Sequence, residues 1–218
     1  MDSTSVGRVT ETFSDPVVVL ANGPSPTHPN PLNILNSAGT LICCDGSADK
    51  VIKNGFTPDV IIGDLDSLTL DPSSFKGKLI HLQKQDNTDL EKALDWCIEN
   101  QIKKVTLLGA TGGREDHELA NFFLMRTFSD QIEIEMITDR FTIYYTEKEK
   151  TFSTDTGRKI SLQPLGFETV ISTIGLKYNL DHEQLKPGGH GISNEATEKS
   201  FSISVEKGSL LVFIAHPS

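Results

Sequence analysis

Cysteines are few in this sequence, and their spacing excludes a disulfide framework. The 218 residues include three cysteines, an odd number without CxxC spacing, and two of them are neighbours in the apolar run LICC. A zinc site or a redox motif needs paired cysteines at short, regular intervals, which this chain lacks. We therefore expect Cys43, Cys44 and Cys97 to be free thiols in the core of a protein from the reducing cytoplasm.

Long hydrophobic runs and an excess of basic residues are also missing. No apolar stretch approaches the ~18 residues that cross a bilayer, and the first fifteen residues contain Asp2, Glu11 and Asp15 but no hydrophobic leader core. Thirty acidic residues against 20 Lys and Arg give a net charge of −10, which opposes broad contact with nucleic acid or an anionic membrane. We expect neither as a partner. A polyanionic substrate would need locally placed cations or a metal ion.

Three familiar nucleotide and metal motifs are absent. The sequence has no GxGxxG, and GATGGRED does not fit a P-loop because Arg114 stands where the second glycine belongs. The stretch DLDSLTLDPSSF lacks the oxygen donor at the fifth position, the glycine at the sixth and the glutamate at the twelfth that an EF-hand loop requires. Any nucleotide or metal site must therefore be built in another way.

What the sequence does contain is an alternation of short apolar runs with helical patterns over residues 16–138. The runs of strand character are VVVL, LICC, VIIG, KLIHL, VTLLG and IEIEMI. Helical patterns lie between them at 46–54, 88–100 and 115–128. This alternation is typical of a mostly parallel sheet covered by helices, and it predicts a Rossmann-like α/β domain.

The helical segments differ in how well the sequence defines them. The helix at 88–100 begins with the capping box TDLE, Thr88–Glu91, and carries an apolar stripe at i, i+3, i+4 and i+7. The helix after GATGGREDH is expected to bury Leu119, Phe122 and Phe123. The segment Leu20–Asn33 contains four prolines, so we expect a stiff, non-helical excursion there.

After about Thr138 apolar and polar residues alternate with a period of two, and glycines and prolines interrupt this alternation. This pattern predicts a small antiparallel β-sandwich or barrel. We expect two domains, an α/β domain over residues 1–139 and a β-sandwich domain over residues 140–218.

Acidic residues follow several consecutive strand-like runs. In parallel sheets ligands bind beyond the carboxyl ends of the strands, so these residues are expected to share one rim. They are Asp45 after LICC, Asp64 and Asp66 after VIIG, Asp86 and Asp89 after KLIHL, and Asp116 after VTLLG. An extended backbone would place Asp64 and Asp66 on one face, where their repulsion calls for a cation. Carboxylate oxygens without a cysteine or histidine cluster favour Mg²⁺. The alternative for Asp45 or Asp86 taken alone is a helix cap or a turn.

The stretch GATGGREDH provides a flexible backbone after a strand, then an arginine, then an apparent helix start. Backbone N–H groups at a helix N-terminus and a guanidinium fork both suit phosphate oxygens. The stretch therefore predicts a phosphate site around Gly112, Gly113 and Arg114, with His117 beside it. The alternative is a plain strand-to-helix turn in which Arg114 pairs with Asp116. In the β-rich tail, turn formation and packing alone would explain GLKYNL and GGHGISNEA.

Taken in order, the motifs DGS, PDVIIGDLDSL, QDNTDLEKAL, LGATGGREDHELAN, GLKYNL and GISNEA resemble those of the thiamine pyrophosphokinase family over about residues 17–200. The resemblance implies an enzyme that transfers the pyrophosphoryl group of ATP to the hydroxyethyl arm of thiamine, with Mg²⁺, giving thiamine diphosphate and AMP. It also implies an α/β domain, a β-sandwich domain, and a homodimer whose active sites lie at the subunit interface.

The resemblance also implies roles for individual residues. The catalytic residues are Asp64, Asp66, Asp89 and Arg114, of which the three aspartates surround the metal. The nucleotide site comprises Asp45, Gly112, Gly113, Arg114, Asp116 and His117. Gln85 and Thr88 lie near the substrates, and the thiamine pocket is built from Tyr178, Asn179, Ser193 and Asn194.

Two departures and two alternatives accompany this resemblance. The first departure is Tyr178, which stands where the family commonly has tryptophan but keeps an aromatic face for the cationic ring of thiamine. The second is DGS, which replaces DGG or DGA and adds a hydroxyl near the nucleotide. A phosphatase of the haloacid dehalogenase type also uses D-x-D after a strand, although DLDSL has leucine where that motif has Thr or Val. The other alternative is a thiamine or nucleotide sensor without catalysis.

Overall fold

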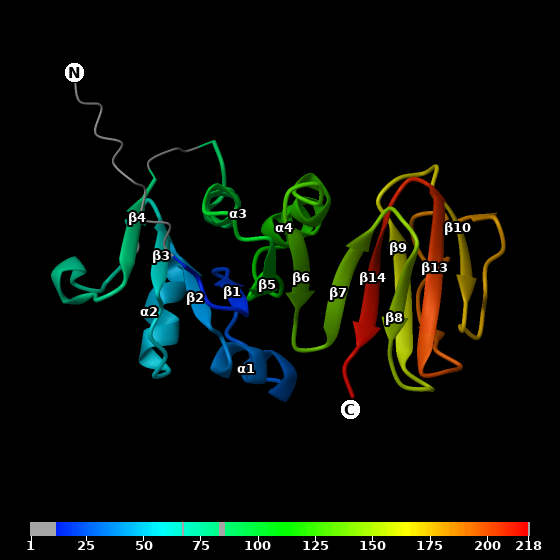
Figure 1. Cartoon of the computed structure of the whole chain (residues 1–218), viewed down its shortest axis with the longest axis horizontal. Coiled ribbons are helices and arrows are strands. Elements are labelled where there is room, and N and C mark those ends of the chain that lie inside the picture. The colour runs from blue at the N-terminus through cyan, green and yellow to red at the C-terminus, as the bar shows by residue number, and fades with distance from the viewer. Residues whose placement is uncertain (1–11, 67, 83–85, 218) are drawn as a thin grey trace, which may run out of the picture.

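A ten-stranded sheet runs the length of the molecule in the computed structural model, which describes residues 12–66, 68–82 and 86–217 (Figure 1). One part of the sheet is parallel and consists of β4 (Lys78–His81), β3 (Val60–Gly63), β2 (Thr40–Cys44), β1 (Val17–Leu20), β5 (Lys104–Leu108) and β6 (Glu133–Ile137), in that spatial order. The predicted parallel sheet is thus confirmed, with each strand at its predicted apolar run.

The helices lie on both faces of the parallel strands. Figure 1 shows α1 (Pro29–Asn36) and α2 (Asp45–Lys53) below them, and α3 (Asp89–Glu99) and α4 (Glu115–Thr127) above. Helices α2, α3 and α4 were predicted. Helix α1 was not, because its prolines indicated a non-helical segment, yet Pro29 begins the helix where a missing N–H costs no hydrogen bond. A short 3-10 turn, η1 (Pro72–Ser74), precedes β4.

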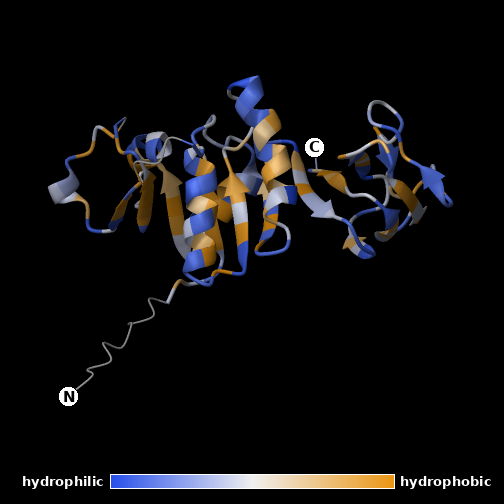
Figure 2. Cartoon of the chain, turned by 90° about the horizontal axis from the view of Figure 1, so that it is seen from above, coloured by the Kyte–Doolittle hydropathy of each residue, from blue (hydrophilic) through white to orange (hydrophobic). Residues whose placement is uncertain are grey.

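Side chains of the parallel strands alternate between two hydrophobic layers. Val17 and Val19 pack with α3 and α4, whereas Val18 and Leu20 pack with α1 and α2. Successive strand residues point to opposite faces, so a strand buried on both faces has to be a continuous apolar run. Figure 2 shows these hydrophobic strands beside the helices, whose hydrophilic residues lie mainly on the outside.

The buried face of α4 differs from the prediction. Leu119 and Phe123 are 59% and 44% exposed, whereas Asn121, Leu124 and Met125 are buried. Only Phe122 of the predicted set packs partly against the core. The expected burial of Leu119 and Phe123 was wrong because a polar residue, Asn121, lies at the centre of the buried face, where it donates a hydrogen bond to the carbonyl of Ala110.

The β-rich part is a sandwich that shares the long sheet. Strands β7 (Phe141–Thr146), β14 (Leu210–Ala215), β9 (Lys159–Pro164) and β12 (Asn194–Glu195) extend the sheet antiparallel. A second antiparallel sheet contains β11 (Glu183–Gln184), β10 (Val170–Ile174), β13 (Ser200–Lys207) and β8 (Lys150–Ser153). Its residues Phe152, Ile171 and Phe201 pack with Ile160 and Val212 of the long sheet. The predicted β-sandwich is confirmed, and β6 pairs directly with β7, which the sequence did not indicate.

None of the helices in the described part of the chain is long and apolar enough to cross a membrane.

Candidate functional site

The acidic pair after β3 lies in a turn. The strand ends at Gly63, Leu65 has a φ of 61°, and the backbone N–H of Asp66 donates to Oδ1 of Asp64 over 3.4 Å. The expectation that an extended backbone places both carboxylates on one face was therefore wrong. A left-handed residue between them lets the chain turn, and the turn still gathers both side chains at the carboxyl end of β3.

Asp64 and Asp66 lie close to a third carboxylate, Asp45, in the first turn of α2. One carboxylate oxygen from each lies within 4.8 Å of the others, and Asp45 is only 1% exposed. Gly63 makes this packing possible, since a Cβ there would lie 2.5 Å from Cβ of Asp45 and 3.4 Å from Cγ of Asp89. Hard oxygen donors at this separation fit a divalent cation such as Mg²⁺, which also offsets the repulsion among them.

Asp89 borders this cluster from the start of α3. The predicted capping box is confirmed, because Oγ1 of Thr88 accepts from the N–H of Glu91 while the N–H of Thr88 donates to Oε2 of Glu91. Lys92, one turn further, donates from Nζ to Oδ1 of Asp89 over 2.9 Å, and its side chain is only 7% exposed. This buried cation beside an acidic cluster was missed, because a lysine in a helical pattern is ordinarily a surface residue.

The glycine turn after β5 contains an exposed ion pair and is bonded to the helix that follows it. The N–H of Gly112 donates to Oε2 of Glu118 over 2.9 Å. Arg114 binds Asp116 through two hydrogen bonds, of 3.1 Å from Nε and 2.7 Å from Nη2. The hydrogen bond from Arg114 lowers the pKa of Asp116 to about 2. The pairing matches the plain-turn alternative, but both side chains are largely exposed, so the guanidinium remains accessible to a phosphate.

The turn after β1 packs against the other strand ends through glycines. A Cβ on Gly23 would lie 2.2 Å from the carbonyl oxygen of Gly109, and one on Gly46 would lie 2.2 Å from Nδ2 of Asn22. The hydroxyl of Ser47 is buried, and its single proton is within hydrogen-bond reach of two carbonyl oxygens, those of Leu20 in β1 at 2.8 Å and Cys44 in β2 at 2.7 Å. The hydroxyl of DGS therefore contacts the backbone of the sheet, and its predicted place near the nucleotide stays a prediction.

These elements enclose a cavity of about 470 Å³, here called the rim cavity. Predicted residues that line it are Asp64, Thr88, Asp89, Gly113, Arg114 and His117. Residues that the sequence did not single out are Asn22, Lys92, Glu118 and Asn121. The rim cavity thus combines carboxylates for a metal ion with an arginine and a lysine for an anion. Such a set can bind and orient a polyphosphate.

The predicted thiamine residues lie together in a different place. Tyr178 is 64% exposed. Asn194 is buried and holds the backbone of Tyr178, accepting from its N–H over 3.1 Å and donating to its carbonyl over 2.8 Å. Asn179 accepts from the N–H of Leu176, and Ser193 adopts a φ of 61°. The asparagines therefore shape the loop that displays Tyr178.

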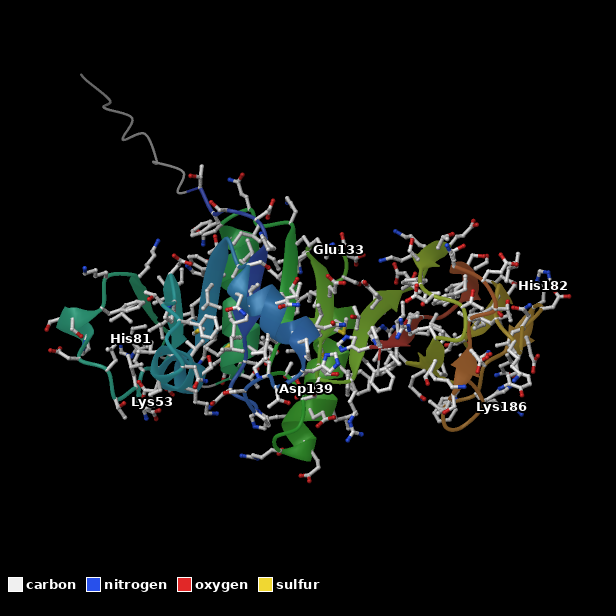
Figure 3. All side chains as sticks on the ribbon, turned by 90° about the horizontal axis from the view of Figure 1, so that it is seen from below. Lys53, His81, Glu133, Asp139, His182 and Lys186 are labelled. Carbon is white, nitrogen blue, oxygen red and sulfur yellow. The ribbon has the colours of Figure 1, made fainter. Side chains whose placement is uncertain are left out.

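This loop and the acidic cluster lie far apart within one chain. Strand β12, which carries Asn194, is separated from β3 by eight steps in the order of the long sheet. At about 4.8 Å per step the separation along the sheet is about 38 Å. Figure 3 shows the same arrangement, with His182 at one end of the molecule and His81 at the other. Gln85, predicted near the substrates, lies outside the described residues.

Comparisons with known proteins agree over both parts of the chain. Residues 32–138 match the family described as thiamin pyrophosphokinase, catalytic domain, and residues 141–210 match thiamin pyrophosphokinase, vitamin B1 binding domain. The chain is 28% identical to thiamine pyrophosphokinase of Bacillus subtilis over 209 residues, covering 89% of this chain and 95% of the relative. It is 27% identical to thiamin pyrophosphokinase 1 of Caenorhabditis elegans over 197 residues, covering 83% of this chain and 80% of the relative. The crystal structure of the Bacillus subtilis enzyme superposes with a TM-score of 0.80 at 27% identity, covering 93% of this chain and 99% of that one.

Proposed function

The chain belongs to the thiamin pyrophosphokinase family, and on that premise we propose that it transfers the pyrophosphoryl group of ATP to the hydroxyl of thiamine, giving thiamine diphosphate and AMP. The observation that carries this proposal is the cluster of Asp45, Asp64 and Asp66, of which Asp64 lines the rim cavity. All three lie inside the region that matches the catalytic domain.

The metal ion in this proposal is Mg²⁺, held by Asp45, Asp64 and Asp66. Their carboxylate oxygens within 4.8 Å of one another are the support for this assignment. Asp89, which the sequence-based prediction placed among the ligands, borders the cluster and pairs with Lys92. A bound Mg²⁺ would neutralise charge on the polyphosphate and on the carboxylates.

The protein groups position the reactants and stabilise charge. Arg114 exchanges its exposed partner Asp116 for phosphate oxygens, and the backbone around Gly113 supplies N–H donors. The thiamine hydroxyl oxygen bonds to the β-phosphorus as the bond between that phosphorus and the α,β-bridging oxygen breaks, so AMP leaves with the bridging oxygen. A carboxylate among Asp64, Asp66 and Asp89 accepts the hydroxyl proton.

Thiamine is held by the β-rich part of a second subunit. A separation of about 38 Å along the sheet prevents the loop of Tyr178 from reaching the acidic cluster of its own chain. Exposed apolar side chains lie beside both halves: Leu119 and Phe123 on α4, and Tyr178 and Ile192 in the β-rich part. In a two-fold dimer each β-rich part covers the α4 of the other subunit, which removes these side chains from water and completes two sites.

Other functions predict different products. A phosphatase would release phosphate or AMP from ATP without thiamine, and a sensor would release neither. The comparisons do not favour either alternative. The test is AMP formation from ATP with Mg²⁺, measured chromatographically with and without thiamine. The proposal expects AMP only when thiamine is present, and equal AMP in both reactions would contradict it.

All three cysteines are free and buried, which supports the proposed cytoplasmic location.

A further inference from the structure

The loop between β3 and β4, residues 64–77, carries the acidic turn at its start. A helix usually joins neighbouring parallel strands and covers one face of the sheet. The described residues of this loop form only the 3-10 turn η1, and apolar side chains of the loop do the covering. They pack against a hydrophobic cluster that contains Ala48 and Val51 of α2. The side chains that do so nearest the acidic turn are Leu65, Leu68 and Leu70. Helix α2 is therefore the support on which this loop rests.

Asp49 of α2 adds a polar contact to the same loop. Its Oδ2 atom accepts one hydrogen bond from the backbone N–H of Thr69 over 2.9 Å and another from the Thr69 hydroxyl over 2.5 Å. Partial burial acts to raise the pKa of Asp49, but the hydrogen bonds from Thr69 and the charge of Lys53 outweigh it and lower the pKa. Asp49 therefore holds Thr69 as an ionised carboxylate, which is the stronger form of the acceptor.

The contact between Asp49 and Thr69 lies close to the acidic cluster in both elements. Asp45 and Asp49 are four residues apart in α2, so they lie on the same face of the helix, one turn apart. In the loop, Asp66 precedes Thr69 by three residues. The other end of the acidic turn is held by the pairing of β3 with β4. The turn is thus held at both ends, once by the sheet and once by the helix that carries Asp45.

Holding the turn matters because the acidic side chains repel one another until a cation binds. One carboxylate oxygen from each of Asp45, Asp64 and Asp66 lies within 4.8 Å of the others, and like charges at this separation repel. A loose loop would carry two of these carboxylates away from Asp45, and a binding cation would then have to order the loop again. A loop that is already held avoids this entropic cost.

We infer that Asp49 is a positioning residue for the metal site, because by holding Thr69 it keeps Asp64 and Asp66 beside Asp45 before the cation binds. The inference rests on the proposed function for the identity of the acidic cluster as a metal site. Asp49 is not among the residues that line the rim cavity, so it acts through the loop and not by touching a substrate.

The test separates the hydrogen bonds of Asp49 from its charge. Asp49→Ala removes both, whereas Asp49→Asn removes the charge and keeps a carboxamide oxygen that accepts hydrogen bonds. Asp71→Ala is the control within the loop, because Asp71 accepts from the N–H and the hydroxyl of Ser73 in the same loop.

Two measurements are made on variants that melt cooperatively. Mn²⁺, which favours the same oxygen ligands as Mg²⁺, is titrated into each protein without nucleotide, and electron paramagnetic resonance measures the free ion. Hydrogen exchange of residues 64–66 and 68–70 is measured on the same proteins without metal. Neither measurement needs turnover.

We expect Asp49→Ala to weaken Mn²⁺ binding by about tenfold, as the loss of hydrogen bonds to a carboxylate implies, and to speed hydrogen exchange in the loop. Asp49→Asn and Asp71→Ala should bind Mn²⁺ within about threefold of wild type. Unchanged Mn²⁺ binding in Asp49→Ala would overturn the inference. An equal loss in Asp49→Asn would also overturn it, since the charge alone would then explain the effect.

Failure of this inference and failure of the proposed function give different results. A wild-type protein that binds no Mn²⁺ would overturn the metal assignment and the role of Asp49 together. If the wild type makes no thiamine diphosphate but loses Mn²⁺ affinity on Asp49→Ala and not on Asp49→Asn, the proposed reaction fails and the positioning role stands.

Discussion

Mixing two inactive variants should restore enzymatic activity if the active site is shared between subunits. Asp66→Asn removes a carboxylate from the acidic cluster, and Tyr178→Ala removes the exposed aromatic ring of the β-rich loop. Asp66 follows β3, and the loop of Tyr178 is held by Asn194 of β12, about 38 Å from β3 along the sheet. A mixed dimer therefore contains one site with both defects and one site with neither.

The magnitude follows from the symmetry of the dimer. After random exchange of equal amounts, about half of the dimers are mixed, and half of the sites in each are intact, so activity should approach about a quarter of wild type. The assay measures thiamine-dependent AMP formation before and after exchange, and differently tagged subunits confirm that mixed dimers formed. No recovery in a sample with confirmed mixed dimers would refute the composite site.

Three further predictions test the site residues and the core. Asp64→Asn should reduce turnover by about a hundredfold or more, because ion-assisted positioning dominates phosphoryl transfer. The exposed control Asp155→Asn should leave turnover unchanged. A near-normal rate for Asp64→Asn would contradict the metal assignment. Arg114→Lys should lose most activity without a change in melting temperature, since lysine cannot form the bidentate contact; full activity would make the arginine structural. Burial raises the pKa of Cys43 and Cys97 to about 12. The thiolate fraction of each is therefore about one in ten thousand at pH 8. Ellman's reagent should react with them only after denaturant is added.

The fold was largely predictable because local patterns and tertiary packing agree in the parallel strands. Runs such as Val17–Leu20 are apolar at every position, and a strand between two helical layers requires this. The prediction failed where tertiary contacts override the local pattern. Pro29 begins a helix, and α4 buries the polar Asn121 while it exposes Phe123. The pairing of β6 with β7 joins the two parts, and no single segment encodes that contact.

The acidic half of the site could be predicted because it follows strand ends. Asp45 and Asp64 come directly after apolar runs, and a parallel sheet places such positions on one rim. Lys92 and Glu118 could not be found in this way, since a charged residue in a helix has no signature that separates a buried contact from a solvated one. The separation of Tyr178 from the acidic cluster depends on the strand order of the whole sheet, which the sequence pattern does not determine.

The most direct test of the proposed reaction is the stoichiometry of its products. ATP, thiamine and Mg²⁺ are incubated with the wild-type protein, and thiamine diphosphate, thiamine monophosphate, AMP and ADP are quantified together by chromatography with mass detection. Attack on the β-phosphorus moves both phosphates in a single step, so the account predicts equal amounts of thiamine diphosphate and AMP with no ADP or thiamine monophosphate. Formation of ADP with thiamine monophosphate, or of AMP without thiamine diphosphate, would contradict it.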